Sequence, residues 1–344
     1  MFEILLTACL AASPGECRTE RLPGAETLAE CRALARRGAA GFPPAFSVQE
    51  YPCIAEGGMP RFTVSEVGPG VFVHKGQHAI PGSANRGDIS NTGFIIGTSG
   101  VMVIDSGATL EMGKELLQAI RDETDLPVTH VVLTHAHPDH IYGAAAFLDD
   151  APQVIAHARH SDAIRARSAT YQEAMSRMLG ESFAGSVEVA PDLAVADVDV
   201  VDLGDRLIDL HAHRTSHTDN DLTVFDRKTG TLFAGDLVFE GHIPALDGSL
   251  LGWIDTLKLL AETPGGRQLV PGHGPVSVEW EAAFDATSGY LDQLAEETRE
   301  AVRNGTPMLQ AIREVMIGAQ ANWLLHDEFN ARNATAAFKE LEWE

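Results

Sequence analysis

Cysteine is missing from most of this chain: all four cysteines, Cys9, Cys17, Cys31 and Cys53, lie near the start of the 344 residues. No two of them form a Cys-x-x-Cys pair, which makes a zinc knuckle improbable. The pattern predicts a small N-terminal module with two disulfides, and three pairings are open. Disulfides would require an oxidising compartment such as the periplasm, whereas four reduced thiols in a cytosolic protein are the alternative.

Basic residues are also scarce, with 25 Lys and Arg against 49 Asp and Glu and a formal net charge of −24. Such a surface repels phosphate backbones and anionic lipid headgroups, so we expect a small-molecule substrate and no nucleic-acid partner. The apolar start, Met1 to Ala12, is too short to span a bilayer and has no Lys or Arg before Arg18. We expect no membrane insertion, and we expect Cys9 to belong to the mature fold.

The order of the expected elements predicts an α/β fold. Strands follow one another from about residue 60, and further along they alternate with helices, which predicts two sheets with helices outside. We expect three parts: a Cys-containing module at 1–58, a core at 59–278 and a helical C-terminal extension at 279–344 that packs on the core. Gly57 and Gly58 form the expected linker between the first two parts.

The segment from Leu133 to His140 carries the strongest chemical signal. Four side chains that can bind metal, those of His135, His137, Asp139 and His140, lie within six residues. Neutral imidazoles at this density would need buried partners unless a cation gathers them. The apolar residues before them predict a strand and those after them a helix, so the segment lies on a strand-to-helix turn.

Three more residues of the same chemical kind follow predicted strands or lie in turns: His217, Asp236 and His273. Each signal is weak alone, because a single histidine before glycine is more often a turn residue. A rigid scaffold gathers distant residues by placing them on loops at the ends of different strands. Together with the preceding motif and in this order, they predict a metal centre.

This order of residues resembles the metallo-β-lactamase superfamily of metallohydrolases, over roughly residues 60 to 275. The run from Ile104 to Gly107 resembles an early strand-end motif of that family. The resemblance implies an αββα sandwich with the metal site at one edge, between the two sheets.

A closer resemblance lies in the cysteine-bearing start, in the segment from His242 to Ser249 and in the ending from Glu340 to Glu344. These stretches are similar to those of the quinoprotein relay system zinc metallohydrolases, relatives of a protein associated with sulfur-oxidation operons. This resemblance implies a periplasmic setting and a quinoprotein dehydrogenase as a partner.

By the same resemblance, His135, His137 and His217 would bind one metal ion, and Asp139, His140 and His273 a second. Asp236 would bridge the two ions. Histidine and carboxylate ligands suit two Zn²⁺ ions, and Fe or Mn could also be held.

Two such ions would share a water and generate a metal-bridged hydroxide as nucleophile near neutral pH. Asp139 would orient this hydroxide and relay its proton. Asp105 would accept an imidazole N–H, and its alternative role is a turn or cap before Gly107.

The resulting prediction is a binuclear zinc hydrolase of a small ester, thioester or lactone-like substrate. Three alternatives are a mononuclear iron dioxygenase of the persulfide type, a β-lactamase and a metal-bearing partner protein. Aspartate at position 236, rather than Cys or Ser, resembles the glyoxalase II-like hydrolases more than the principal β-lactamase classes, which disfavours the β-lactamase alternative. Among the other histidines, His242 either lines the substrate cleft or is a plain loop residue, and His157 and His160 are expected to cap a helix or face solvent.

Overall fold

The computed structural model describes residues 2–10, 13–25, 30–31, 33–34, 46–50, 53–55 and 62–344. The chain divides into two compact units, Met1–Thr63 and Val64–Glu344. The predicted boundaries after residues 58 and 278 stay predictions.

The first unit contains a four-stranded sheet in which β1 pairs with each of the other three strands. Its strands are β1 (Phe2–Leu10), β2 (Ser13–Ala25), β3 (Phe46–Glu50) and β4 (Cys53–Ala55). The apolar start of the chain is therefore a strand. The side chains of Cys9, Cys17 and Cys53 lie outside the described ones, so the two disulfides stay a prediction.

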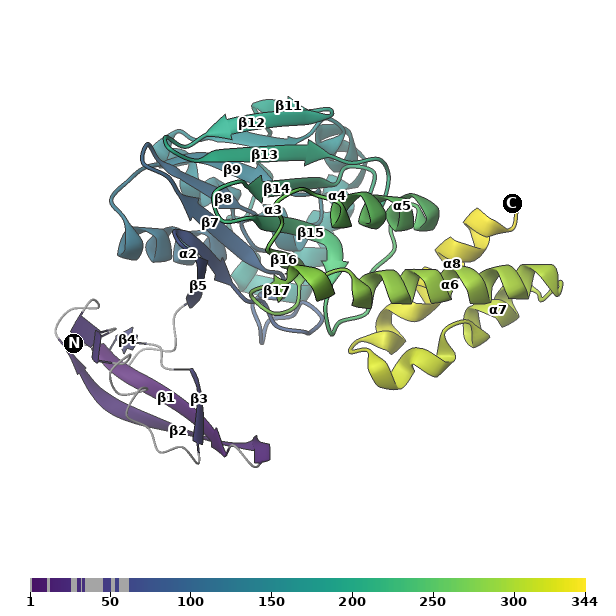
Figure 1. Cartoon of the computed structure of the whole chain (residues 1–344), viewed down its shortest axis with the longest axis horizontal. Coiled ribbons are helices and arrows are strands. Elements are labelled where there is room, and N and C mark those ends of the chain that lie inside the picture. Colours follow the sequence, from purple (N-terminus) through teal and green to yellow (C-terminus); the bar gives the residue numbers. More distant parts are fainter. Residues whose placement is uncertain are drawn as a thin grey trace. The chain divides into compact units, whose positions relative to one another are not determined.

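The second unit is built around two sheets (Figure 1). The first sheet has seven strands in the order β11-β10-β9-β8-β7-β6-β5, and the second has six in the order β12-β13-β14-β15-β16-β17. The strands of the first sheet are β5 (Val64–Gly68), β6 (Val71–His74), β7 (Thr92–Ile96), β8 (Val101–Ile104), β9 (Val128–Leu133), β10 (Gln153–His157) and β11 (Leu193–Val195). Those of the second are β12 (Val198–Asp202), β13 (Leu207–Ala212), β14 (Leu222–Asp226), β15 (Thr231–Phe239), β16 (Gln268–His273) and β17 (Val278–Glu279).

The two sheets pack face to face through one apolar cluster. Met102 and Ile104 of β8 and Val132 of β9 meet Val224 of β14 and Phe233 of β15 in it. Burial of such side chains contributes about 25 cal/mol per Å² of apolar surface removed from water. This packing fixes the relative position of the strand ends that carry the predicted ligands.

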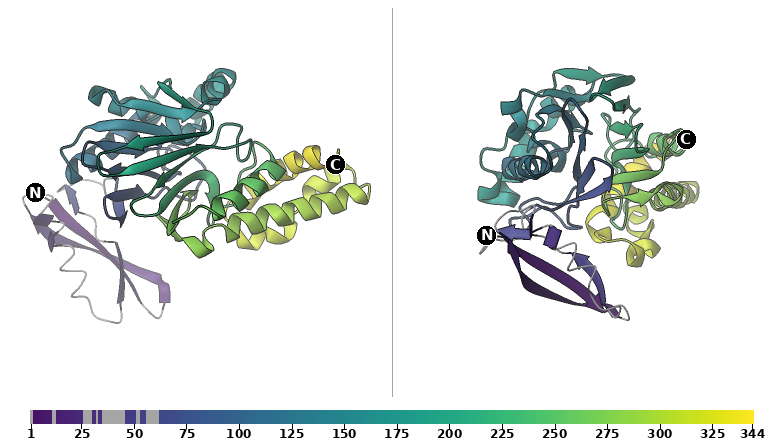
Figure 2. Two further views of the ribbon diagram at one scale, coloured as in Figure 1. Left: turned by 45° about the horizontal axis from the view of Figure 1, so that its top comes forward. Right: turned by 60° about the vertical axis from the view of Figure 1, so that its left-hand side comes forward.

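Helices cover the outer faces of both sheets (Figure 2). One side has α2 (Leu110–Glu123), α3 (Pro138–Ile141), η1 (Ala144–Asp150), α4 (His160–Leu179) and η2 (Gly180–Phe183). The other has α5 (Leu250–Ala261), η3 (Trp280–Ala282), α6 (Asp285–Arg303), α7 (Met308–Glu314), η4 (Ile317–Asn322) and α8 (His326–Leu341). The predicted αββα sandwich with a helical C-terminal region is confirmed.

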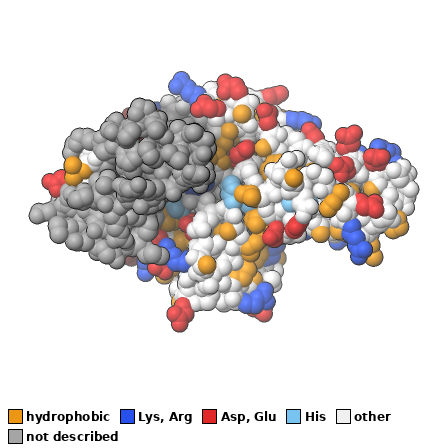
Figure 3. Space-filling view, turned by 90° about the horizontal axis from the view of Figure 1, so that it is seen from below, with side chains coloured by type: hydrophobic (Ala, Val, Ile, Leu, Met, Phe, Trp, Pro, Cys, Tyr) orange, Lys and Arg blue, Asp and Glu red, His pale blue; other side chains and the backbone are white. Residues whose placement is uncertain are grey.

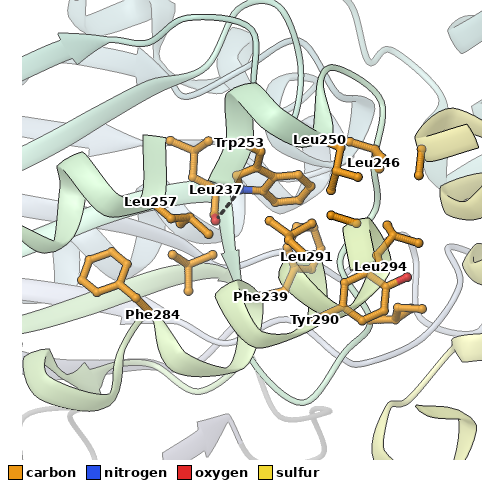
Figure 4. Close-up of a cluster of buried hydrophobic side chains, with 14 of the residues drawn as sticks. Leu237, Phe239, Leu246, Leu250, Trp253, Leu257, Phe284, Tyr290, Leu291 and Leu294 are labelled. Carbon is orange, nitrogen blue, oxygen red and sulfur yellow. Dashed lines mark hydrogen bonds between the residues drawn. The ribbon is translucent and has the colours of Figure 1, made fainter. Parts of the chain in front are cut away.

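The C-terminal helices share a second apolar cluster with the six-stranded sheet (Figure 4). Trp253 of α5 is fully buried in it and donates its indole N–H to the carbonyl of Leu237 on β15 at 2.9 Å. Tyr290 and Leu294 of α6 pack from the other side. Every residue of β15 is buried because this strand has the other sheet on one face and these helices on the other.

Two local predictions differ from the structure. The segment after the motif forms the short helix α3 and the 3₁₀ helix η1, where one helix was predicted. The strand β15 continues to Phe239, so Asp236 lies inside the strand instead of after it. No helix among the described residues is long and apolar enough to cross a membrane.

Candidate metal centre

All seven predicted ligands converge at one edge of the sandwich. The turn after β9 brings four of them, the β13–β14 connection brings His217, β15 brings Asp236 and the end of β16 brings His273. Their ligand atoms form two groups, each with all members within 4.8 Å of one another. The groups are His135, His137, His217 and Asp236, and Asp139, His140 and His273. The six other residues divide as the resemblance implied, and Asp236 falls in the first group.

The carboxylate of Asp236 lies between the two groups. Its Oδ2 is 3.7 Å from Nε2 of His135 and 3.4 Å from Nε2 of His217, both in the first group. It also faces the second group, with Oδ1 3.2 Å from Nε2 of His140 and Oδ2 3.4 Å from Nε2 of His273. One carboxylate can therefore contact both metal positions.

The backbone around Asp236 gives its carboxylate this position. Gly235 has a φ of 52°, in the left-handed region that favours glycine, and the pairing of β15 with β16 shifts register there. The irregularity aims Asp236 into the site from within a strand. Gly272 on the neighbouring strand leaves the space, since a Cβ there would lie 2.0 Å from Asp236 Oδ1.

Asp139 completes the second group from the first turn of α3. Its Oδ2 is 3.5 Å from Nε2 of His140 and 3.3 Å from Nε2 of His273. Burial opposes its ionisation, but His140 and His273 outweigh burial and hold the pKa of Asp139 well below its usual range. The residue is therefore a carboxylate at neutral pH.

The outer ring nitrogens of the ligand histidines have partners of their own. Nδ1 of His140 is 2.7 Å from Asp105, Nδ1 of His217 is 2.7 Å from the carbonyl of Ala245, and Nδ1 of His273 is 2.8 Å from the carbonyl of Ile89. Each contact leaves Nε2 to face the centre. The predicted contact of Asp105 with an imidazole is confirmed.

His137 is turned the other way from these histidines. Its Nε2 is 3.2 Å from Oδ2 of Asp247, and its Nδ1 is 3.0 Å from Nε2 of His217, at the first group. Asp247 thus fixes the ring so that Nδ1 is its ligand atom.

Three buried polar atoms of the centre, Nε2 of His135, Nε2 of His140 and Oδ1 of Asp236, make no hydrogen bond of acceptable geometry, although the last two lie 3.2 Å apart. Unpaired buried polar atoms are costly, and here all three point at the shared centre. Metal ions in this centre would satisfy them, so the residues fit metal binding.

The charges of the cluster fit as well. Burial lowers the pKa of His217 to about 3, so its imidazole is neutral and can act as a ligand. Although burial opposes it, Asp236 and Asp139 raise the pKa of His273 to about 10. The carboxylates therefore favour positive charge in the centre. Protons on the histidines can provide this charge, and bound metal cations would replace those protons.

A cavity of about 460 Å³ opens over the centre. Asp139, Asp236 and His273 are among its lining residues, and most of its walls are apolar. The wall from α4 consists of Arg167, Thr170, Tyr171, Ala174, Met175 and Met178. Phe329 and Arg332 of α8 line it too, so a C-terminal helix forms part of the cavity wall. The space-filling view shows histidine side chains reaching the surface beside hydrophobic ones (Figure 3).

The helix α8 also supports the loop that carries the partners of two ligands. Asn333 is fully buried, donates to the carbonyl of Pro244 at 2.6 Å and accepts from the amide of Leu246 at 3.0 Å. These bonds flank Ala245, whose carbonyl contacts His217. Sequence reasoning missed Asn333, since a single asparagine in a helix carries no signal. Asp247 lies in the segment from His242 to Ser249, whose resemblance to a family indicated no role for this residue.

The remaining histidines differ in how they match the predictions. His242 lines the cavity, and its ring stacks on that of His273 with centroids 5.2 Å apart. His157 and His160 do not face solvent, because both are buried. His157 instead accepts the backbone N–H of Arg159, just before α4, on its Nδ1 at 2.9 Å. Its Nε2 is 3.2 Å from the carbonyl of His213.

Comparison with known proteins agrees with this fold and site. Residues 85–282 match the metallo-beta-lactamase superfamily. The chain belongs to this superfamily. It is a hydrolase with a His and Asp site that can bind metal.

Two curated relatives and one solved structure illustrate the similarity. A metallo-beta-lactamase type 2 of Bacillus sp. (strain 170) is 24% identical over 220 residues, covering 62% of this chain and 77% of the relative. The acyl-coenzyme A thioesterase MBLAC2 of Bos taurus is 26% identical over 190 residues, covering 49% of this chain and 62% of the relative. A metallo-beta-lactamase from Pontibacter korlensis has a TM-score of 0.54 at 21% identity, covering 67% of this chain and 98% of that one.

Proposed function

We propose that this protein is a binuclear, zinc-dependent hydrolase of small ester, thioester or lactone-like substrates. The observation that carries the proposal is the position of the Asp236 carboxylate, within 3.2 to 3.7 Å of imidazoles from both ligand groups. A carboxylate that reaches two neighbouring positions is suited to bridging two ions.

The donor set supports zinc. It consists of imidazole nitrogens and carboxylate oxygens without a thiolate, a set that suits Zn²⁺ and that Fe or Mn could also use. When bound, the ions would lower the pKa of a shared water towards neutrality and polarise the substrate carbonyl.

The protein's own contribution to the reaction is orientation and proton transfer. Asp139 lines the cavity and is ionised, so it can accept the proton of the attacking water and pass it to the leaving group. The ring of His137 is held in place by the carboxylate of Asp247, and the ring of His140 by that of Asp105. Such a preorganised site needs little rearrangement during the reaction.

The cavity supports a small substrate with an apolar portion. Its volume of about 460 Å³ and its wall of Met175, Met178 and Phe329 accommodate an acyl or aryl group next to the centre. The name of the bovine relative, a thioesterase, supports cleavage of an acyl bond by water.

We also propose the finer assignment to the quinoprotein relay system zinc metallohydrolases, with a periplasmic location and a quinoprotein dehydrogenase partner. Its support is the clustering of cysteine in the first 53 residues and the resemblance of the segments 242–249 and 340–344. Fractionation of cells expressing the native protein tests the location. Co-purification with a quinoprotein dehydrogenase, identified by its cofactor, tests the partner.

The test of the hydrolase proposal is metal content together with activity, on protein purified without added metal or chelator. We expect two zinc ions per chain and cleavage of members of a panel of esters, thioesters and lactones. Asp236→Asn should bind fewer ions and lose activity, whereas Asp255→Asn, on the exposed side of α5, should retain both.

One iron per chain would contradict the proposal and point to oxygenation of a sulfur substrate. Rapid cleavage of a chromogenic lactam without ester cleavage would assign the protein to β-lactam hydrolysis instead.

A further inference from the structure

Two arginines from distant helices lie at the cavity beside one carboxylate. Arg167 of α4 and Arg332 of α8 both line it, and both approach Asp247. Among the described residues that line the cavity, they are the only lysines or arginines. We propose that this arginine pair binds an anionic group of the substrate. The inference rests on the proposed function and narrows it to esters or thioesters that carry a carboxylate, phosphate or sulfate.

The charge balance favours an anion here. Two guanidinium groups face the single carboxylate of Asp247, so this cluster has one positive charge in excess, in a protein with a formal net charge of −24. The other two carboxylates that line the cavity, those of Asp139 and Asp236, face the ligand histidines. A surface so acidic repels anions in general. A local excess of positive charge is therefore what an anionic substrate would require to enter this cavity.

Both arginines also have donors to offer. Nη2 of Arg332 is 2.6 Å from Oδ1 of Asp247, but Nη2 of Arg167 is 3.7 Å from Oδ2, beyond hydrogen-bond range. The side chains of Arg167 and Arg332 are 36% and 51% exposed. A guanidinium presents five N–H donors in a planar fork that matches a carboxylate or phosphate.

The position of Asp247 sets the distance between the anion and the scissile bond. Its Oδ2 is also 3.2 Å from Nε2 of His137, so one carboxylate separates the arginine pair from a ligand of the first group. The anion and the scissile carbonyl must then lie a short chain apart on the same small molecule. The apolar wall of Met175, Met178 and Phe329 is left for the remainder of the substrate.

The experiment compares two substrates that differ in charge and little in length. The 4-nitrophenyl monoester of pentanedioic acid carries a terminal carboxylate, and 4-nitrophenyl pentanoate is its neutral counterpart. We expect the wild type to prefer the anionic ester in kcat/KM. Arg167→Gln should raise KM for the anionic ester at least about tenfold, equivalent to about 1.4 kcal/mol. The same variant should change kcat/KM for the neutral ester less than about twofold.

Three further variants separate recognition from structure. Arg165→Gln, on the same helix but exposed and paired with Asp162, should behave as wild type. Arg167→Lys should recover part of the preference, because it restores the charge without the fork. Arg332→Gln should also lose the preference, and its zinc content is measured, because this residue contacts the partner of His137.

Binding measured separately distinguishes failure of this inference from failure of the hydrolase proposal. Calorimetry with the monoanilide of pentanedioic acid and with pentananilide, whose amides resist cleavage, reads recognition without hydrolysis. Tighter binding of the anionic anilide, lost in Arg167→Gln, supports the arginine pair even if no ester is cleaved. Equal affinity for the two anilides, or an Arg167→Gln variant that retains the preference, overturns it.

Discussion

Nδ1 of His140 lies 2.7 Å from a carboxylate oxygen of Asp105, and both side chains are buried. The same carboxylate accepts hydrogen bonds from the amide and the hydroxyl of Thr134, each at 2.8 Å. Asp105 has a φ of 56°, a left-handed conformation that a non-glycine residue adopts at a cost. The backbone at the end of β8 is therefore strained at Asp105, and this conformation directs the carboxylate of Asp105 to the histidine motif after β9.

The first prediction concerns this carboxylate. Asp105→Asn should weaken metal binding roughly 10- to 100-fold, because an amide accepts the imidazole N–H less strongly and can present its own donor instead. Competition with a chromogenic chelator measures the change. Asp162→Asn, at an exposed position on α4, is the control and should bind metal as wild type does. Unchanged affinity in Asp105→Asn would show that Asp105 only shapes the turn.

A second prediction follows from the space that Gly272 leaves for Asp236. In Gly272→Ala, the new Cβ would lie 2.0 Å from Oδ1 of Asp236 and 2.7 Å from the carbonyl carbon of Gly235, so the carboxylate must move. We expect the metal content to fall below two ions per chain and the metal-free protein to lose about 1–3 kcal/mol.

The matched control for this change is Gly289→Ala. Gly289 lies inside helix α6, where a Cβ would meet nothing within 4 Å. Alanine there should stabilise the protein by about 0.5–1 kcal/mol and leave the metal content unchanged. Metal analysis and denaturant unfolding of both variants check the pair, and a Gly272→Ala protein with full metal content would contradict the argument.

The sequence could indicate the candidate ligands because their signal is local and chemical. His135, His137, Asp139 and His140 stand within six residues, and strand ends are readable from apolar runs. The sequence did not predict that β15 continues past Asp236, because this continuation depends on the helices α5 and α6 that cover the strand. Contributions from α8 were missed for a similar reason. Asn333 and Arg332 gain their roles only when a segment about 90 residues away packs against them.

A third prediction tests that long-range support. Asn333→Ala removes the bonds to the carbonyl of Pro244, to the amide of Leu246 and to the hydroxyl of Tyr290. We expect a loss of about 2–4 kcal/mol in unfolding free energy, because buried partners are left unsatisfied.

The metal affinity of Asn333→Ala should also fall, since the loop with Ala245 and Asp247 loses its anchor. Thr335→Ala, at a half-buried position on the same helix whose hydroxyl donates to the carbonyl of Ala331, is the control. If Asn333→Ala lowers stability but binds metal with wild-type affinity, α8 stabilises the fold without positioning the ligands.

The last prediction concerns acid stability and a histidine outside the metal centre. His160 is buried at the start of α4, and neither ring nitrogen has a hydrogen-bond partner. Burial, with a smaller effect from His157, lowers the pKa of His160 to about 4, against an ordinary value of 6.5. Between these two pH values the unfolded chain binds a proton that the folded protein does not, so stability falls as the pH drops through this window.

His160→Leu removes that difference in proton binding and the two unpaired nitrogens. Relative to wild type, the variant should gain stability on going from pH 7 to pH 5 by an amount on the order of 2 kcal/mol. The free energy of unfolding of both proteins is measured in denaturant at each pH, after treatment with a chelator. The metal ligands titrate equally in the two proteins, so their effect cancels in the difference. His211→Leu, at an exposed position of β13, should follow the wild-type pH dependence. Parallel curves for His160→Leu and wild type would mean that His160 binds a proton in the folded protein as readily as in the unfolded one.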